Sequence, residues 1–288
     1  MSKDDFDVLA YGISSTIYKK RESDVVVKVS SFSVEPHDIR KELAILRRIS
    51  HPNVIPVLDV DEGLGEEEVA IWMPYIPFSL DDFLNSPYFS PHPVPVGARR
   101  SLGPKGFTEL TRSFLSQLVS ALAHLHKEGI GHRDIKPSNI LITPHGWLRL
   151  IDFGVSFLPS SDEEVGYPES ATEMYFEVCT GPYRPPELLF SPHCYDATKV
   201  DMWSLGCLLA GLFTTLRLLD EDEDDETDAG EDRDKPFVFA SCSQGKWVRD
   251  SLFNASRGEI GLAWSIFRIL GTPNEETWPV RRSLSPFS

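Results

Sequence analysis

The chain has 288 residues, is 41% hydrophobic and 25% charged, and carries a formal net charge of −16. This length can bury a substantial core in one large domain or two lobes, and the acidic balance argues against nucleic acid or a membrane surface as the main partner. Four cysteines without C-x-x-C spacing, no N-terminal signal segment and no long apolar run predict a cytoplasmic and/or nuclear protein without structural zinc.

Residues 5–30 predict β-strands joined by turns. The strongest signal is the β-branched run Val25-Val26-Val27-Lys28-Val29. Before it, residues 10–17 read A-Y-G-I-S-S-T-I, with Gly12 as their single glycine. Taken alone, this stretch is a hairpin turn and Lys28 a solvated strand end.

Residues 36–49 predict a helix, and Pro36 is placed for its first turn. The apolar residues at helical spacing are Ile39, Leu43, Leu46 and Ile49. Glu42 flanks this apolar stripe and can reach inward to Lys28. The charged helix is equally compatible with Glu42 as a surface partner of a residue one turn away.

The middle of the chain alternates between strand, loop and helix signals. Residues 69–75 predict a buried strand, and residues 85–106, rich in Pro, Ser and Gly, predict a loop insertion. From Thr108 an apolar pattern predicts a buried helix that ends at Gly129.

Residues 132–154 contain two acidic side chains, Asp134 and Asp152, and the amide side chain of Asn139 between them. This set suits phosphoryl transfer. An acceptor hydroxyl needs a carboxylate to orient it and take its proton, and the phosphates need Mg²⁺ held by oxygen ligands such as a carboxylate and an amide. Asp134 fits the first role, and Asn139 with Asp152 fits the second.

The pattern H-R-D-x-x-x-x-N followed by D-F-G resembles the catalytic-loop signature of eukaryotic protein kinases. The resemblance implies an α+β bilobal kinase domain over residues 5–288, with ATP and Mg²⁺ as cofactors. We expect residues 5–75 to form a small β-rich N-lobe with one key helix. We expect residues 76–288 to form a larger, mainly helical and incomplete C-lobe.

The resemblance also implies roles for individual residues. Asp134 is the expected catalytic base, Lys136 neutralises charge on the transferred group, and Thr180 bridges these two side chains. For the nucleotide, the expected binding residues are Gly12, Lys28, Glu42, Met73 and Ile76. Met73 takes the gatekeeper position, and Ile76 is the expected adenine donor because Pro74 has no N–H.

Residues 267–279, which contain L-G-T-P and end in W-P, resemble an insert of the cyclin-dependent and mitogen-activated kinase group. The form D-I-K-P-S-N resembles serine/threonine kinases. The resemblance places the glycine-rich phosphate loop of kinases at residues 10–17, where only Gly12 remains. This reduced loop and the changed phosphosite resemble those of fungal kinases that activate cyclin-dependent kinases, so another cyclin-dependent kinase is a candidate protein substrate. Cyclin binding is unsupported by the sequence of the 36–49 helix. The alternative is a catalytically weak pseudokinase, or a truncated kinase fragment, that acts as a binding module.

The resemblance places the activating phosphosite of such kinases at Tyr175 rather than at a threonine. The three positions that would hold its phosphate are Lys41, Arg133 and Phe157. A phosphate would lose one cationic partner there and keep one that is not bidentate. We therefore expect activation without a phosphothreonine at this position, with Glu173 and Glu177 as candidate built-in charges.

The last part of the chain supports the catalytic loop. A helix over residues 196–213 carries Asp201, which is expected to hold the backbone of that loop. Residues 220–235 contain eleven acidic and two basic residues, or −9 of the −16 net charge, and predict a disordered insertion. The resemblance implies further helices after residue 280, which would supply an arginine to Glu187. We expect either a truncated product or gene model, or an unstable C-lobe in which the Glu187 carboxylate lacks that partner.

Overall fold

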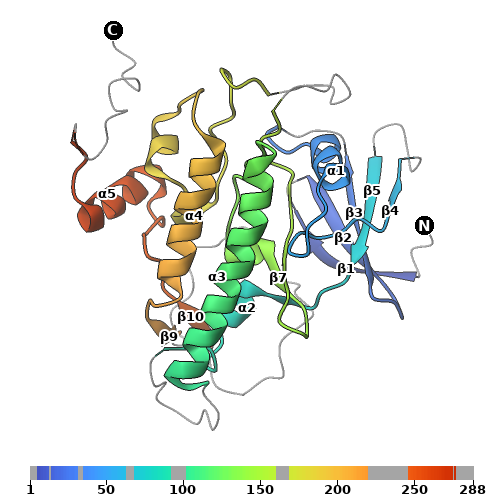
Figure 1. The fold of residues 1–288 in the computed structure, drawn as a ribbon, viewed down its shortest axis with the longest axis horizontal. Helices are drawn as coiled ribbons and strands as arrows, with labels where there is room; N and C mark the ends of the chain where they lie inside the picture. The colour runs from blue at the N-terminus through green and yellow to red at the C-terminus, as the bar shows by residue number, and fades with distance from the viewer. Residues whose placement is uncertain are drawn as a thin grey trace.

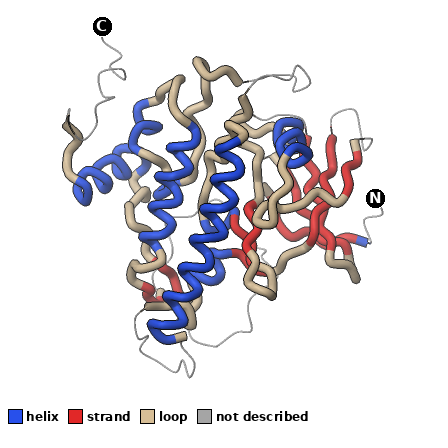
Figure 2. Tube along the Cα trace, viewed as in Figure 1, coloured by secondary structure: helices blue, strands red, loops and turns tan. Residues whose placement is uncertain are grey.

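The computed structural model describes residues 5–12, 14–31, 35–62, 68–91, 102–159, 169–219, 246–274 and 276. A β-rich lobe with one helix, α1, stands beside a mainly helical lobe (Figures 1 and 2). This arrangement confirms the expected bilobal α+β fold. In the described residues no helix is long and apolar enough to cross a membrane.

The N-lobe is built on an antiparallel sheet with the strand order β1-β2-β3-β5-β4. These strands are β1 (Phe6–Tyr11), β2 (Ser15–Lys20), β3 (Val25–Ser31), β4 (Asp59–Asp61) and β5 (Glu68–Pro74). The β-branched run forms central strand β3, which pairs Lys28 with Ile71 of β5. Ile71, on the same face of the sheet as Lys28, is fully buried in the apolar core, so this face of the sheet belongs to the core.

Helix α1 (Ile39–Arg48) packs against this sheet. It begins at Ile39 and not at Pro36, so the predicted place of Pro36 in the first turn is wrong. The reason is the cap: the Asp38 side chain accepts hydrogen bonds from the N–H groups of Arg40 and Lys41 at 2.8 and 3.2 Å. The apolar stripe of the helix is buried as expected.

The C-lobe holds the longer helices and short strands. The helices are α2 (Leu80–Leu84), α3 (Gly103–Lys127), α4 (Ala197–Gly211) and α5 (Gly258–Leu270), with 3-10 turns at Pro137–Asn139, Gly181–Tyr183 and Pro186–Phe190. The strands are β6 (Phe78–Ser79), β7 (Ile140–Ile142), β8 (Leu148–Leu150), β9 (Leu216–Leu218) and β10 (Trp247–Arg249). Strands β6, β7 and β8 form one small sheet, and β9 pairs with β10.

Helix α3 begins five residues before the predicted start at Thr108, so the expected loop over residues 85–106 ends too late. Phe107 is 1% exposed, which extends the buried stripe of the helix one turn toward its N-terminus. Pro104 stands in the first turn, where a missing N–H costs nothing. Residues 92–101 of that loop and the acidic insertion at 220–235 lie outside the described residues.

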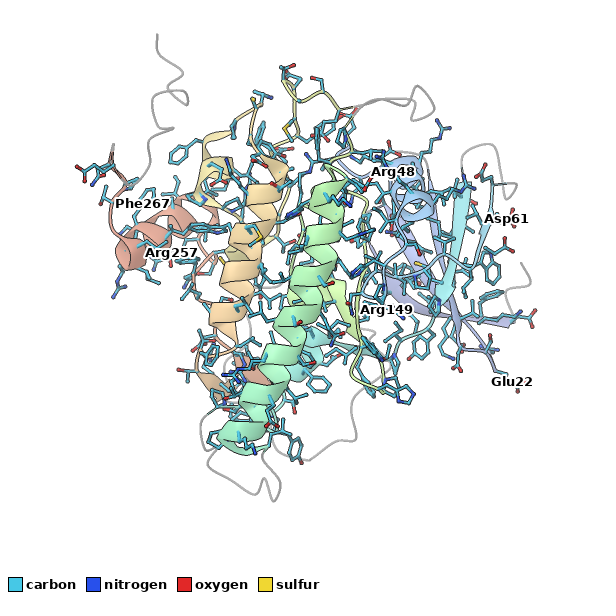
Figure 3. The ribbon with its side chains drawn as sticks, viewed as in Figure 1. Glu22, Arg48, Asp61, Arg149, Arg257 and Phe267 are labelled. Atoms are coloured by element: carbon cyan, nitrogen blue, oxygen red, sulfur yellow. The ribbon has the colours of Figure 1, made fainter. Side chains whose placement is uncertain are left out.

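One apolar core joins the two lobes. It includes Leu43 and Leu46 of α1 together with Leu118 and Leu122 of α3. Helices α3 and α4 run side by side through the C-lobe (Figure 1). At the surface between the lobes, Arg48 lies between α1 and α3 (Figure 3) and forms an ion pair of 3.3 Å with Glu128.

Leu118 and Val119 give a matched test of this core, because they are neighbours on α3 with exposed fractions of 2% and 44%. We expect Leu118→Ala to lower the free energy of unfolding by about 2–5 kcal/mol through lost apolar burial and the cavity it leaves. Val119→Ala is expected to change it by less than about 0.5 kcal/mol. Urea unfolding measures both, and equal losses would contradict the place of Leu118 in the core that joins the two lobes.

Candidate active site

The catalytic loop is closed by the β7–β8 hairpin, which returns the chain so that residue 151 lies against residue 139. The Ile151 N–H donates to the Asn139 carbonyl at 3.0 Å. Asp134 precedes the hairpin and Asp152 follows it. The short insert seen between these two acids in the sequence is therefore a β-hairpin that holds both at one end of the small sheet.

Three side chains contact the Asp134 carboxylate. Thr180 Oγ1 donates to Asp134 Oδ1 at 2.7 Å, and Lys136 Nζ lies 3.0 Å from Asp134 Oδ2. Lys136 also donates to Thr180 Oγ1 at 2.8 Å, so Asp134, Lys136 and Thr180 form a closed ring of contacts. The Asn139 amide donates to Asp134 Oδ2 at 2.9 Å. The structure thus brings together the expected base, the expected cation and the expected bridging threonine.

Lys28 of β3 joins two carboxylates from different parts of the chain. Its Nζ lies 2.9 and 2.7 Å from the two oxygens of Glu42 on α1, and 2.9 Å from Asp152 Oδ1. Lys28 and Glu42 are buried, with exposed fractions of 8% and 2%. Burial opposes the charged form of Lys28, but the carboxylates of Asp152 and Glu42 raise its pKa above the ordinary value. The interpretation of Glu42 as a surface partner is therefore wrong.

The Asp201 side chain of α4 supports the catalytic loop from below. It is fully buried and accepts the backbone N–H groups of His132 and Arg133 at 2.8 and 2.7 Å. His126 Nε2 lies 2.8 Å from the same carboxylate. These bonds hold Arg133 at a φ of 64°, a conformation that is uncommon for residues other than glycine. The expected role of Asp201 is confirmed.

A pocket lies between β2, β3, α1 and the residues after β8. Its lining includes Gly12, Lys28, Glu42 and Asp152, which are four of the expected nucleotide and metal residues. It also includes His37, which the sequence did not single out. The sequence signal was absent because His37 belongs to no kinase motif and precedes the cap of α1. Burial lowers the pKa of His37, which favours its neutral form in this pocket.

The side chains at this end of the cleft fit a magnesium ion with bound phosphates. The two N–H groups of the Asn139 amide face the carbonyl and carboxylate of Asp134, each at 2.9 Å, which leaves the amide oxygen as a ligand. The Lys28 cation lowers the pKa of Asp152, so this carboxylate is ionised at neutral pH. No group of three His, Cys, Asp or Glu side chains in the described residues could hold a metal alone. A magnesium site completed by substrate phosphates needs no such group.

Met73 and Ile76 lie where the N-lobe sheet leads into the C-lobe. Met73 is buried in β5 opposite Val26, and Ile76 falls between β5 and β6. The Tyr75 N–H donates to the Asp24 carbonyl at 2.9 Å, so it is not available as a donor to an adenine. This leaves Ile76 as the expected backbone donor to an adenine. Neither residue lines the described pocket, which covers the phosphate end of the cleft.

The activation segment, which is the stretch of chain between D-F-G and Glu187, departs from the expectation for Glu173 and Glu177. Glu173 pairs with His193 at 3.1 Å on the surface, and Glu177 is exposed. The carboxylate that contacts Arg133 belongs to Glu169, at 2.6 Å. Sequence analysis missed Glu169 because the segment before it has no periodicity and no motif with a constant spacing to Arg133.

Glu187 lies partly buried near the start of the Pro186–Phe190 turn. Burial raises its pKa above the ordinary value, and Lys199 opposes this effect. Lys199 itself forms an ion pair of 3.4 Å with Asp196. The nearby Arg184 instead pairs with Glu259 of α5 at 2.9 Å.

The fold and these contacts define a protein kinase. The protein kinase domain family matches residues 10–256, so the chain belongs to this family. The chain is 27% identical over 282 residues both to cyclin-dependent kinase 11.2 of Caenorhabditis elegans and to the probable serine/threonine-protein kinase At1g09600 of Arabidopsis thaliana. These alignments cover 95% of this chain but 35% and 31% of the relatives, so the chain spans about a third of their length.

Among solved structures, the yeast RNA polymerase II CTD kinase CTDK-1 complex contains a similar chain. The similarity has a TM-score of 0.63 with 26% identity, and it covers 97% of this chain and 74% of the other. Together with the relatives, this finding confirms the resemblance to cyclin-dependent-kinase-like serine/threonine kinases.

The raised pKa of Glu187 gives a pH-dependent prediction. The folded chain binds the Glu187 proton more tightly than the unfolded chain, whose ordinary pKa is about 4.3. Stability is therefore lost as pH rises from about 4.3 through the folded pKa. Because glutamine does not titrate, we expect Glu187→Gln to raise Tm by about 2 °C at pH 7, with a smaller difference near pH 4.5. Thermal unfolding at both values tests this.

The matched control is Glu177→Gln, on the exposed part of the same segment. It is expected to leave Tm unchanged at both pH values. A Glu187→Gln variant that is less stable than wild type at pH 7 would show that Glu187 has a cationic partner in solution, contrary to this prediction.

Proposed function

We propose that this chain transfers the γ-phosphoryl group of Mg-ATP to serine or threonine hydroxyls of proteins. The observation that carries the proposal is the ring formed by Asp134, Lys136 and Thr180, together with the Lys28–Glu42 ion pair. Kinases need both parts in place, because one positions the acceptor and the other positions the phosphates.

Each of these side chains has a separate task. Asp134 orients the acceptor hydroxyl and takes its proton, since its carboxylate is held by Asn139 and Thr180 and cannot rotate freely. Lys136 offsets negative charge that develops on the transferred group. Lys28 contacts phosphate oxygens and is itself positioned by Glu42. Bound Mg-ATP supplies the phosphoryl group, with Asn139 and Asp152 as the residues that would hold the metal.

The substrate class rests on resemblance. The relatives carry the names cyclin-dependent kinase and serine/threonine-protein kinase, and one solved neighbour is a kinase of the RNA polymerase II CTD. We infer that the substrate is a protein, and that another cyclin-dependent kinase is the first candidate to test. A cytoplasmic or nuclear location fits such a substrate.

A second candidate function is a binding module without useful catalysis. It is favoured by the glycine loop, in which Gly12 is the single glycine of residues 10–17. Fewer glycines allow fewer backbone N–H groups to approach the phosphates closely. The intact contacts of Lys28, Asp134 and Asp152 favour the enzyme.

The test is phosphate transfer from ATP to serine, threonine and tyrosine peptide libraries and to a purified cyclin-dependent kinase, with and without Mg²⁺. We expect Mg²⁺-dependent transfer to serine or threonine. Asp134→Asn should lower kcat by about 10²–10⁴-fold, because the base is lost while the fold remains. Mass spectrometry identifies the acceptor residue.

The control is Asp24→Asn, an exposed acid of the N-lobe that is expected to keep wild-type activity. Circular dichroism and Tm establish that all variants fold. If wild type and Asp134→Asn protein fold, bind ATP and are equally inactive, the chain is a binding module and the enzymatic proposal fails.

A further inference from the structure

The Arg133 side chain is the largest fully buried side chain in the described residues, with an exposed fraction of 0%. A buried guanidinium is costly unless its N–H groups are paired. Its Nε donates to the Val155 carbonyl at 2.7 Å, and Nη1 donates to the Tyr195 hydroxyl at 2.8 Å. Nη1 and Nη2 also donate to the two oxygens of Glu169, at 2.6 and 2.7 Å.

Glu169 is therefore held as an anion between several donors. Besides the two-pronged contact with Arg133, its Oε1 accepts the backbone N–H of Tyr175 at 2.6 Å. Lys41 Nζ lies 3.8 Å from its Oε2. Glu169 is 8% exposed and Lys41 5% exposed, so these charges are shielded from water and their attraction is little screened. A bidentate arginine, a lysine and a backbone N–H also form the donor set that protein sites use to hold a phosphate.

These contacts tie together three segments that must be correctly placed for catalysis. Arg133 directly precedes Asp134 in the catalytic loop. Lys41 directly precedes Glu42 on α1, which positions Lys28. Tyr175 lies in the activation segment that also supplies Thr180 to the Asp134 carboxylate. One carboxylate thus links the base, the key helix and the bridging threonine.

We propose that Glu169 is a positioning residue that serves as a built-in substitute for an activating phosphate and keeps the activation segment ordered without phosphorylation. The inference rests on the proposed kinase activity, and it assigns that activity a mode of regulation. Glu169 acts through Arg133, Lys41 and the Tyr175 backbone, and it touches none of the reacting groups.

The surroundings of Tyr175 disfavour phosphate at the position where related kinases carry it. Burial, followed by the Glu35 carboxylate, raises the pKa of the Tyr175 hydroxyl to about 12, with further contributions from Glu169 and Asp38. A phosphate added to that hydroxyl would face the same acidic groups. The guanidinium that would receive it is already occupied by Glu169.

The third of the positions that would hold a phosphate gives independent support to the proposed role of Glu169. Phe157 stands there, and the Arg133 guanidinium lies 5.9 Å from the centre of its ring. An aromatic face favours a cation but offers no hydrogen bond to an anion. The residues at these three positions therefore favour holding Arg133 in place over binding a second or larger anion.

The central experiment compares Glu169→Gln with wild type. Glutamine has nearly the same shape but no charge, so it breaks the buried pair with Arg133. Because this pair couples the activation segment to the catalytic loop, we expect kcat to fall about 10- to 100-fold, while stabilisation of the protein by Mg-ATP in thermal unfolding is largely retained. Hydrogen exchange should become faster at residues 170–180, above all at the Tyr175 N–H.

Two further variants separate positioning from general damage. Glu173→Gln, which removes an exposed acid of the same segment, should leave kcat and hydrogen exchange as in wild type. Glu169→Asp keeps the charge on a shorter side chain and should recover part of the lost kcat. If Glu169→Gln does not fold, Lys41→Gln carries the test, with an expected fall in kcat of about 3-fold and faster exchange at Tyr175, because it leaves the Arg133 pair intact.

Phosphatase treatment tests the same proposal without a mutation. Wild-type protein should keep its activity after treatment, and mass spectrometry should find Thr172 and Tyr175 unmodified in the active protein. Phosphate at either residue, with activity lost on its removal, would overturn the proposal. So would Glu169→Gln, or Lys41→Gln in its place, with the kcat and hydrogen exchange of wild type. If wild type transfers no phosphate at all, the proposed function fails, and hydrogen exchange at Tyr175 still decides whether Glu169 orders the segment.

Discussion

The buried Asp201 carboxylate is the contact on which the geometry of the site depends. It accepts the backbone N–H groups of His132 and Arg133, two donors that would otherwise be buried without partners. With these bonds in place, Arg133 takes its left-handed conformation and its side chain is fully buried, while the Asp134 carboxylate contacts Lys136 and Thr180. A strained residue of this kind persists only where surrounding contacts determine its conformation, and the position of Asp201 on rigid α4 provides that constraint.

The contacts among the Lys28, Glu42 and Asp152 side chains likewise join segments that are distant in the sequence, here across the two lobes. They come from β3, α1 and the residues after the β7–β8 hairpin, and the buried charges of Lys28 and Glu42 are stabilised only when their partners are near. The Asp38 N–H also donates to the Gly154 carbonyl at 3.0 Å, which joins the start of α1 to the D-F-G backbone. Because Glu42 and Lys41 are neighbours on one helix, the position of α1 couples the phosphate end of the cleft to the activation segment.

The sequence predicted those parts of the site that follow motifs of constant spacing. Asp134, Asn139 and Asp152 lie within one 23-residue stretch, and the hairpin between them is short, so their proximity follows from the chain itself. Helix starts were less predictable. The start of α1 is set by the local cap Asp38, which the apolar pattern does not show, and the start of α3 is extended by the burial of Phe107. Glu169 could not be predicted, since an irregular segment carries no periodicity that would indicate which of its acids turns inward.

The balance of charge around Arg133 explains why several departures from related kinases occur together. A phosphate carries about −1.5 to −2 charges at neutral pH and is matched by a cluster of cations. Glu169 carries a single charge, which the bidentate Arg133 nearly balances alone. A third cation at position 157 would then leave the buried cluster with excess positive charge, and Phe157 avoids this. Burial and the nearby Arg133 lower the pKa of Lys41 to about 8, and Glu169 opposes them. Positive charge is therefore already disfavoured in this cluster, and another cation would add to the repulsion.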